Sequence, residues 1–340
     1  MAIGEVVKRL ALVFIAISAG AAAAADLEMQ RFGGGYGSVR YFATSPLEKG
    51  SPAEVAFVVV HGWGGGADKC EEARSFLGAA AKALREGERM PYVIAPLFPR
   101  REVLKKHNVS AEGLALWNES WSRDLTQRGR AADDWRGGGD ASNGSFSSYD
   151  VIDLIFSKLG DKSRYPNLRR VVLAGFSAGG QFVSRYAAVG RGEVRVGVDV
   201  AYVAMSPSSW LRFDPSAPWH YGLDGRTRYS QGVSNDQVFT NLSARTVVYA
   251  CGSADVSVRG ALDKTPPAMA QGINRYDRFL RQMSHIEAFP SWRAKAIFHV
   301  FGGMAHDWRG AYARKELVEF VLHGRTDLFA APDPARTKAD

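Results

Sequence analysis

Six short apolar runs recur along this chain, and helical patterns lie between them. The runs cover residues 55–60, 92–97, 171–174, 194–204, 246–250 and 296–300. Most are apolar at consecutive positions, which is typical of strands buried on both faces. Strands that alternate with helices form parallel β-α-β units. The sequence therefore predicts an α/β fold, with a mostly parallel central sheet and helices on both faces.

The segments between the runs divide into helices and irregular stretches. Helices are predicted over residues 70–85, from the third strand to about residue 189, and around Leu317 near the end. The glycine-rich residues 32–37 are predicted to be a loop. Two long irregular stretches, residues 100–145 and 207–236, are expected to form the walls and lid of a substrate cleft. Their aromatic side chains either line that cleft or pack in the core, and both interpretations stay open. These side chains are Trp117, Trp121, Trp135, Trp210, Trp219 and Tyr221.

The N-terminus has the pattern of a secretory signal peptide. Lys8 and Arg9 precede an apolar stretch, residues 10–17, and small residues follow up to Ala25. This order is typical of cleaved leaders, and the apolar part is shorter than the roughly 20 residues of a membrane-spanning helix. We expect a secreted or periplasmic protein with no stable membrane insertion after leader removal. The expected units are residues 1–25 (signal peptide), 26–325 (one large domain) and 326–340 (C-terminal tail).

Charge, cysteine content and metal-binding motifs limit which partners and cofactors are expected. The net charge is +8, but basic residues are scattered with no run of five or more, so we expect no nucleic-acid partner. No zinc-type spacing or HExxH motif is present, so we expect no metal. Cys70 and Cys251 are the only cysteines, and either a disulfide or two buried thiols is compatible with export. The oligomeric state is not indicated.

Residues 175–179, with the sequence GFSAG, match the pattern G-x-S-x-G. A valine-rich strand leads into the motif and a small-residue helix leads out, which is the setting of a nucleophile elbow. In so tight a turn, side chains at 175 and 179 would collide with the neighbouring strand and helix. The pattern indicates Ser177 as a nucleophile presented at a helix N-terminus.

A serine nucleophile needs a base and an acid that orients the base. In enzymes with such an elbow the chain order is serine, acid, histidine. His306, in the loop between the last strand and the last helix, has the required placement, and His220 is the alternative base. Asp255 follows the fifth strand and is the predicted acid. Asp263 and Asp214 are the alternative acids.

The negative charge that forms on an attacked carbonyl oxygen needs hydrogen-bond donors. One predicted donor is the backbone N–H of Ala178, directly after the nucleophile. The other is expected from Trp63 or Gly64, in the HGWGGG loop at residues 61–66. His61 is expected to pack beneath this loop.

The HGWGGG loop, the GFSAGG elbow at residues 175–180 and the late His306 together resemble the α/β-hydrolases, in particular serine esterases and lipases. The resemblance spans about residues 55–322. Residues 147–153, 185–187, 207–210 and 268–276 also resemble a less characterised group of microbial and fungal hydrolases. The resemblance implies the α/β-hydrolase fold and acyl transfer to serine, without a cofactor.

These features predict an exported hydrolase that cleaves a small-molecule or polymeric carboxylic ester through Ser177, His306 and Asp255. A serine peptidase or acyltransferase with the same elbow is the first alternative. A non-catalytic binding protein on a hydrolase scaffold is the second, and the presence of all three side chains disfavours it.

Overall fold

The computed structural model describes residues 28–34, 37–64, 70–117, 134–142 and 146–331. The predicted signal peptide lies outside the described residues, as does Trp121. The predicted C-terminal tail is described only as far as residue 331. None of the helices in the described ranges has the length and hydropathy needed to cross a bilayer.

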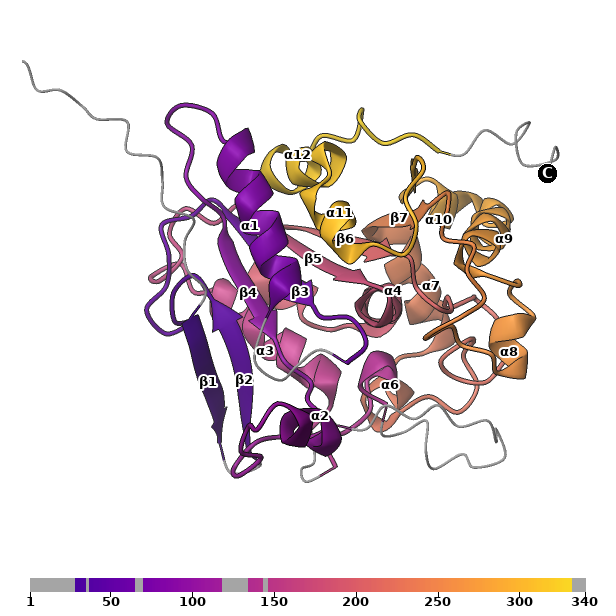
Figure 1. Ribbon diagram of the computed structural model, residues 1–340, viewed down its shortest axis with the longest axis horizontal. Coiled ribbons are helices and arrows are strands. Elements are labelled where there is room, and N and C mark those ends of the chain that lie inside the picture. The colour runs from indigo at the N-terminus through magenta and orange to yellow at the C-terminus, as the bar shows by residue number, and fades with distance from the viewer. Residues whose placement is uncertain (1–27, 35–36, 65–69, 118–133, 143–145, 332–340) are drawn as a thin grey trace, which may run out of the picture.

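One eight-stranded sheet forms the centre of the structure, with the order β1-β2-β4-β3-β5-β6-β7-β8 (Figure 1). The strands from β4 to β8 in this order are parallel, and each predicted apolar run supplies one of them. The predicted mostly parallel sheet is thus confirmed. The parallel strands are β3 (Val55–Val60), β4 (Tyr92–Pro96), β5 (Arg170–Phe176), β6 (Asp199–Met205), β7 (Thr246–Gly252) and β8 (Ala296–Phe301).

Two antiparallel strands at one edge of the sheet were not predicted. These are β1 (Glu28–Gly34) and β2 (Gly37–Ala43), and β2 pairs with β4. The prediction of a loop over residues 32–37 was wrong at residues 32–34 and 37, which belong to these strands. Glycine is depleted in strands but tolerated at a sheet edge, where little packing is required of it.

The predicted strand at residues 194–204 was wrong in its first part. A short helix, α5 (Glu193–Val196), ends at Gly197 with φ of +64°, and β6 begins only at Asp199. A left-handed residue ends a helical turn, and glycine adopts it without steric cost. Asp199 therefore lies at the exposed start of its strand, where it pairs with Arg170.

Helices cover both faces of the sheet. Alternate residues of β3 point into two separate cores, because successive side chains of a strand face opposite sides. On one face, α1 and α12 lie side by side (Figure 1). This layer comprises α1 (Glu71–Ala83), α11 (Trp308–Ala313) and α12 (Lys315–His323). The other layer comprises α3 (Ser148–Leu159), α4 (Ala178–Val189), α7 (Asn235–Ala244), α9 (Arg275–Glu287) and α10 (Pro290–Arg293). The predicted helices at residues 70–85, up to 189 and around Leu317 correspond to α1, α4 and α12.

The remaining short helices lie in the two long irregular stretches and after β7. They are α2 (Arg101–Lys106), η2 (Trp135–Gly137), α6 (Arg228–Gln231) and α8 (Pro266–Met269). Of the six aromatic side chains whose role was open, the five in the described ranges are buried, so these five pack in the core. Packing in the core stabilises the fold, because such large rings bury a large apolar area there.

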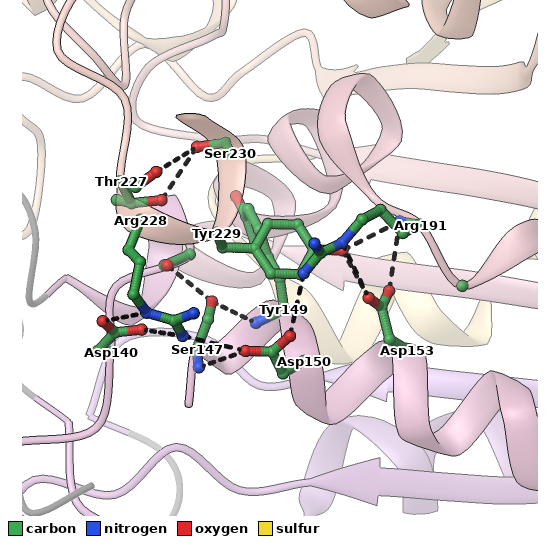
Figure 2. Close-up of polar contacts among 12 residues, drawn as sticks. Asp140, Ser147, Tyr149, Asp150, Asp153, Arg191, Thr227, Arg228, Tyr229 and Ser230 are labelled. Atoms are coloured by element: carbon green, nitrogen blue, oxygen red, sulfur yellow. Dashed lines mark hydrogen bonds and ion pairs between the residues drawn. The ribbon is translucent and has the colours of Figure 1, made fainter. Parts of the chain in front are cut away.

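The stretch at residues 207–236 is anchored to α3 through α6, as Figure 2 shows. The guanidinium of Arg228 binds both carboxylate oxygens of Asp140, at 2.8 and 2.9 Å, and reaches Asp150 at 3.3 Å. The next residue, Tyr229, donates its hydroxyl hydrogen to the buried carboxylate of Asp153 at 2.8 Å. These contacts hold this stretch against the scaffold of the sheet.

The two cysteines are both free and buried. Cys70 belongs to the core on the α1 side of the sheet, whereas Cys251 belongs to the core on the α4 side. A disulfide needs Cα atoms within about 7 Å and side chains that face each other. The sheet separates the two thiols, so of the two alternatives the structure has buried thiols.

We expect titration of the denatured, unreduced protein with Ellman's reagent to find both cysteines as thiols. In the native protein the reaction should be slow, because burial raises the pKa of both thiols and keeps them protonated. Absence of free thiols in the denatured sample would contradict the described packing.

Candidate active site

Ser177 occupies a sharp turn between β5 and α4. Its backbone has φ of +56° and ψ of −114°, a region that residues with a side chain rarely adopt. The glycines around it make this turn possible. A Cβ atom on Gly175 would lie 2.2 Å from the carbonyl carbon of Gly179, and one on Gly179 would lie 2.2 Å from the carbonyl oxygen of Val60. The crossing of these backbones requires glycine and holds Ser177 at the carboxyl end of β5.

Three side chains from separate loops meet at this turn. The Nε2 atom of His306 lies 3.0 Å from the Oγ atom of Ser177, and its Nδ1 atom lies 2.7 Å from Oδ2 of Asp255. His306 follows β8, Asp255 follows β7 and Ser177 follows β5. Because these strands are parallel, their carboxyl ends share one edge of the sheet. The ring of Phe176 packs against the imidazole of His306, with 4.8 Å between centroids.

Solvent reaches these three groups unequally. The side chain of His306 is 31% exposed, whereas that of Asp255 is fully buried. Ser177 is 8% exposed as a whole residue. The arrangement has an accessible imidazole, a serine hydroxyl beside it, and a carboxylate shielded from water behind it.

A buried arginine lies behind the carboxylate of Asp255. Oδ1 of Asp255 has no hydrogen-bond partner among the described residues, and Nη1 of Arg275 lies 3.8 Å from it. Burial lowers the pKa of Arg275, and the charge of Asp255 opposes that shift. The Nη2 atom of Arg275 donates to the carbonyl oxygen of Ala261 at 2.7 Å. Arg275 thus connects the Asp255 loop to the segment that follows it.

The alternative acids and the alternative base lie in other hydrogen-bond networks. Asp263 accepts hydrogen bonds from the hydroxyls of Tyr221, at 2.7 Å, and Thr265, at 2.8 Å. Asp214 binds the backbone and hydroxyl of Ser216. Within the described ranges, neither aspartate forms a hydrogen bond with the imidazole of His306.

Among the described residues, His220 forms no hydrogen bond with Ser177. Its carbonyl accepts from Arg185 at 3.0 Å, and its buried Nδ1 has no partner in the part of the chain that the structure describes. Burial, together with the positive charges of Arg185 and Arg136, lowers the pKa of His220 well below its ordinary value. A proton acceptor for Ser177 has to reach its hydroxyl, and the structure brings His306 there instead.

The loop after β3 runs beside the elbow and is braced from below. Nε2 of His61 accepts a hydrogen bond from the backbone N–H of Phe98 at 3.0 Å, so Nδ1 carries the hydrogen and donates to the carbonyl of Gly62 at 2.8 Å. The N–H of Gly62 donates to Oε1 of Glu72 at 3.0 Å. His61 therefore lies beneath the loop, as predicted.

The possible oxyanion donors follow from this bracing. Because Glu72 occupies the N–H of Gly62, Trp63 and Gly64 are the next positions that could supply a donor from this loop. Gly64 adopts φ of +76°, while residues 65–66 lie outside the described residues. Ala178 is the first residue of α4, where backbone N–H groups have no partner within the helix.

No protein-family model matches this sequence, and no curated protein matches it. Solved structures do match. A poly(3-hydroxybutyrate) depolymerase from Bordetella parapertussis is 18% identical with a TM-score of 0.63, covering 92% of this chain and 94% of that one. Poly(aspartic acid) hydrolase-1 from Sphingomonas sp. KT-1 is 17% identical with a TM-score of 0.59, covering 87% of this chain and 98% of that one. This chain has the α/β-hydrolase fold.

In this α/β-hydrolase fold, a pocket of about 800 Å³ opens beside Trp63. Apart from Trp63, its described lining comes from the segment after Asp255 rather than from the two long stretches expected to form the cleft walls. The lining residues are Trp63, Gly260, Ala261, Leu262, Lys264, Thr265 and Pro266. The connection between β7 and α8, which was not predicted to be a wall, forms most of the described wall of this pocket.

Two further residues of the site were missed by sequence analysis. Arg275 is the first residue of α9, and Asn274 caps that helix by accepting from the N–H of Asp277 at 2.8 Å. The cap indicates where the helix begins, but nothing local shows that Arg275 reaches back to Asp255. Glu72, in the first turn of α1, is equally ordinary in the sequence.

Proposed function

We propose that this protein is a serine hydrolase that cleaves carboxylic esters through an acyl-enzyme intermediate. The observation that carries the proposal is the continuous contact of Ser177, His306 and Asp255, at 3.0 and 2.7 Å. Nucleophile, base and orienting acid need this mutual geometry, whatever the fold around them.

The proposed reaction begins with transfer of a proton from Oγ of Ser177 to Nε2 of His306 as Oγ attacks the ester carbonyl carbon. Asp255 accepts a hydrogen bond from the Nδ1–H group of His306, which keeps Nε2 free to take the proton and stabilises the imidazolium. The tetrahedral oxyanion is expected to receive hydrogen bonds from the N–H of Ala178 and from Trp63 or Gly64. His306 then protonates the departing alcohol, and a water molecule activated by His306 releases the acid.

The proposed substrates include polymeric as well as small esters. The two solved structures described above are named for enzymes that act on polymers. A polymeric ester is therefore included beside small esters, and the open pocket beside Trp63 has room for an extended chain.

Fluorophosphonate labelling tests the nucleophile, followed by a series of 4-nitrophenyl esters of increasing acyl length. We expect one label per chain on Ser177 and no label on the Ser177→Ala variant. Hydrolysis of the esters should be lost upon labelling. A label on another residue, or full ester turnover by labelled protein, would overturn the proposal.

Export is also proposed, on the leader pattern of residues 1–25. Signal peptidase cleavage after Ala25 would give a mature protein that begins at Asp26. N-terminal sequencing of protein from the native host checks this start. Soluble cytoplasmic protein that retains Met1 would contradict export.

Replacing Asp255 with asparagine should lower kcat by about 10⁴-fold, less than the loss of the serine itself. An amide can hold the imidazole in the wrong tautomer and lacks the charge that stabilises the imidazolium. Asp263→Asn is the matched control, because Asp263 is also buried and hydrogen-bonded but binds Tyr221 instead. Its kcat should stay within about fivefold of the wild-type value. Equal losses in the two variants would show that Asp255 has no special role.

A further inference from the structure

The pocket beside Trp63 lies between two loops of the proposed catalytic edge. Trp63 follows β3, in the loop proposed to donate to the oxyanion, and residues 260–266 follow Asp255 in the connection from β7 to α8. The pocket is therefore flanked by the loop that contains Trp63 and by the segment that follows Asp255, and we expect a substrate held at Ser177 to extend into it. The following inference rests on the proposed hydrolase function.

Lys264 is the one charged residue among the described residues that line the pocket. It is exposed and forms no ion pair with any residue in the described ranges. The other lining side chains are apolar or, in Thr265, an uncharged hydroxyl. An anion entering this space would meet a lysine ammonium whose charge is not already neutralised by a neighbouring carboxylate.

The nearest acidic residue in the sequence faces the protein interior. Asp263 is 3% exposed, and its carboxylate accepts hydrogen bonds from Tyr221 at 2.7 Å and from the N–H of Thr265 at 3.0 Å. Burial lowers the pKa of the nearby Arg278, and the charge of Asp263 opposes that shift. Asp263 is therefore engaged within the wall and does not oppose an anion in the pocket.

Basic and acidic groups lie together behind the lining. The guanidinium carbons of Arg100 and Arg136 lie 4.8 and 5.5 Å from the ring of Trp63. Arg136 is paired with Asp134, so its net effect is small. On the other wall, Arg275 lies behind Ala261 and is faced by Asp255. The pocket thus has a positive surface group and no acidic group in its described lining.

The wall that carries Lys264 is held at fixed points. Oγ of Ser208 donates to the carbonyl of Ala261 at 3.1 Å and accepts from the N–H of Asp263 at 3.2 Å. Arg275 donates to the same carbonyl of Ala261 at 2.7 Å. Because its neighbours are anchored, Lys264 presents its ammonium group from a defined backbone position, which favours selection between substrates rather than general attraction.

We propose that this pocket is a subsite for an anionic group of the substrate, and that Lys264 is its specificity-determining contact. The substrate class is an ester with a carboxylate on the part that enters the pocket, such as a half-ester of a dicarboxylic acid or an acidic oligomer. Neutral esters bind the same catalytic centre without this contact.

Two substrates of equal length test the proposal: 4-nitrophenyl hexanoate, and mono-4-nitrophenyl adipate, in which a carboxylate replaces the terminal methyl group. We expect Lys264→Met to lower kcat/KM for the adipate ester about tenfold and to leave the hexanoate ester within twofold. The adipate preference of the wild type should also decrease as salt is added, because salt screens exposed charges.

Lys295→Met is the matched control, since its loss changes the net charge equally. Lys295 is exposed just before β8, at the amino-terminal ends of the parallel strands and so away from the proposed catalytic residues. The control should leave both values unchanged, whereas Lys264→Arg should retain the adipate preference. Equal losses for both esters in Lys264→Met, or an unchanged ratio, would overturn the subsite.

A binding measurement separates this proposal from the proposed function. Calorimetry on the Ser177→Ala variant compares monomethyl adipate with methyl hexanoate, and needs no turnover. Addition of Lys264→Met should raise the Kd of monomethyl adipate about tenfold and leave methyl hexanoate unchanged. An unchanged Kd for monomethyl adipate would overturn the anionic subsite, whether or not the esters are hydrolysed. Absence of ester hydrolysis in the wild type would instead overturn the hydrolase function.

Discussion

Replacing Ser177 with alanine is expected to lower kcat for 4-nitrophenyl esters by roughly 10⁴- to 10⁶-fold. The hydroxyl at the elbow is the proposed nucleophile, and without it no acyl-enzyme forms. The remaining backbone donors and the pocket support only slow attack by water. Turnover and thermal unfolding should be measured on the same preparation.

The fold should survive this change. Alanine keeps the Cβ atom at the strained φ of +56°, so the backbone energy of the elbow is unchanged. The lost hydrogen bond joins Ser177 to the partly exposed imidazole of His306. We expect the free energy of unfolding to change by about 1 kcal/mol or less. Ser184→Ala is the matched control in α4, the helix that follows Ser177, because among the described residues Oγ of Ser184 donates only to the carbonyl of Gln181. Wild-type kcat in Ser177→Ala would refute the assignment of the nucleophile.

His306→Ala should cost about as much kcat as Ser177→Ala, and the double variant little more than either. Groups that act in one proton transfer are strongly non-additive, because removal of one leaves the other without its role. Kinetics of the two single variants and the double variant measure this directly. Independent, multiplying losses would show that His306 does not act on Ser177.

His220→Ala addresses the alternative base. His220 is buried and packs on Tyr221, so we expect a lower Tm but a kcat close to wild type when measured well below the transition. A silent His306→Ala together with an inactive, folded His220→Ala would transfer the role of base to His220.

Local sequence patterns predicted the parts of the fold that depend on short stretches of chain. Continuous apolar runs indicated the parallel strands, since burial on both faces requires apolar side chains at successive positions. The spacing of Gly175, Ser177 and Gly179 indicated the tight turn, because its steric demands involve neighbouring residues. The edge strands β1 and β2 carry weaker patterns, and the glycines there were interpreted as a loop.

Two open alternatives, the role of the aromatic side chains and the state of the cysteines, were decided only by the packing of distant segments. The five described aromatic side chains of the long stretches are equally large and apolar in a cleft or a core, so composition does not distinguish the two. Cys70 directly precedes α1 and Cys251 lies near the end of β7, yet the sheet places them in different cores. Which side of the sheet a residue faces depends on the register of its element.

The sequence by itself determined the α/β architecture and named Ser177, His306 and Asp255 as residues to examine, because strand burial, turn sterics and chain order are written in local patterns. Only the tertiary structure decided that these three side chains touch, that Arg275 lies behind Asp255, and that Lys264 faces a pocket beside Trp63. Such contacts join segments far apart in the chain. Their distances follow from how helices and strands pack as rigid bodies, and no local pattern encodes that.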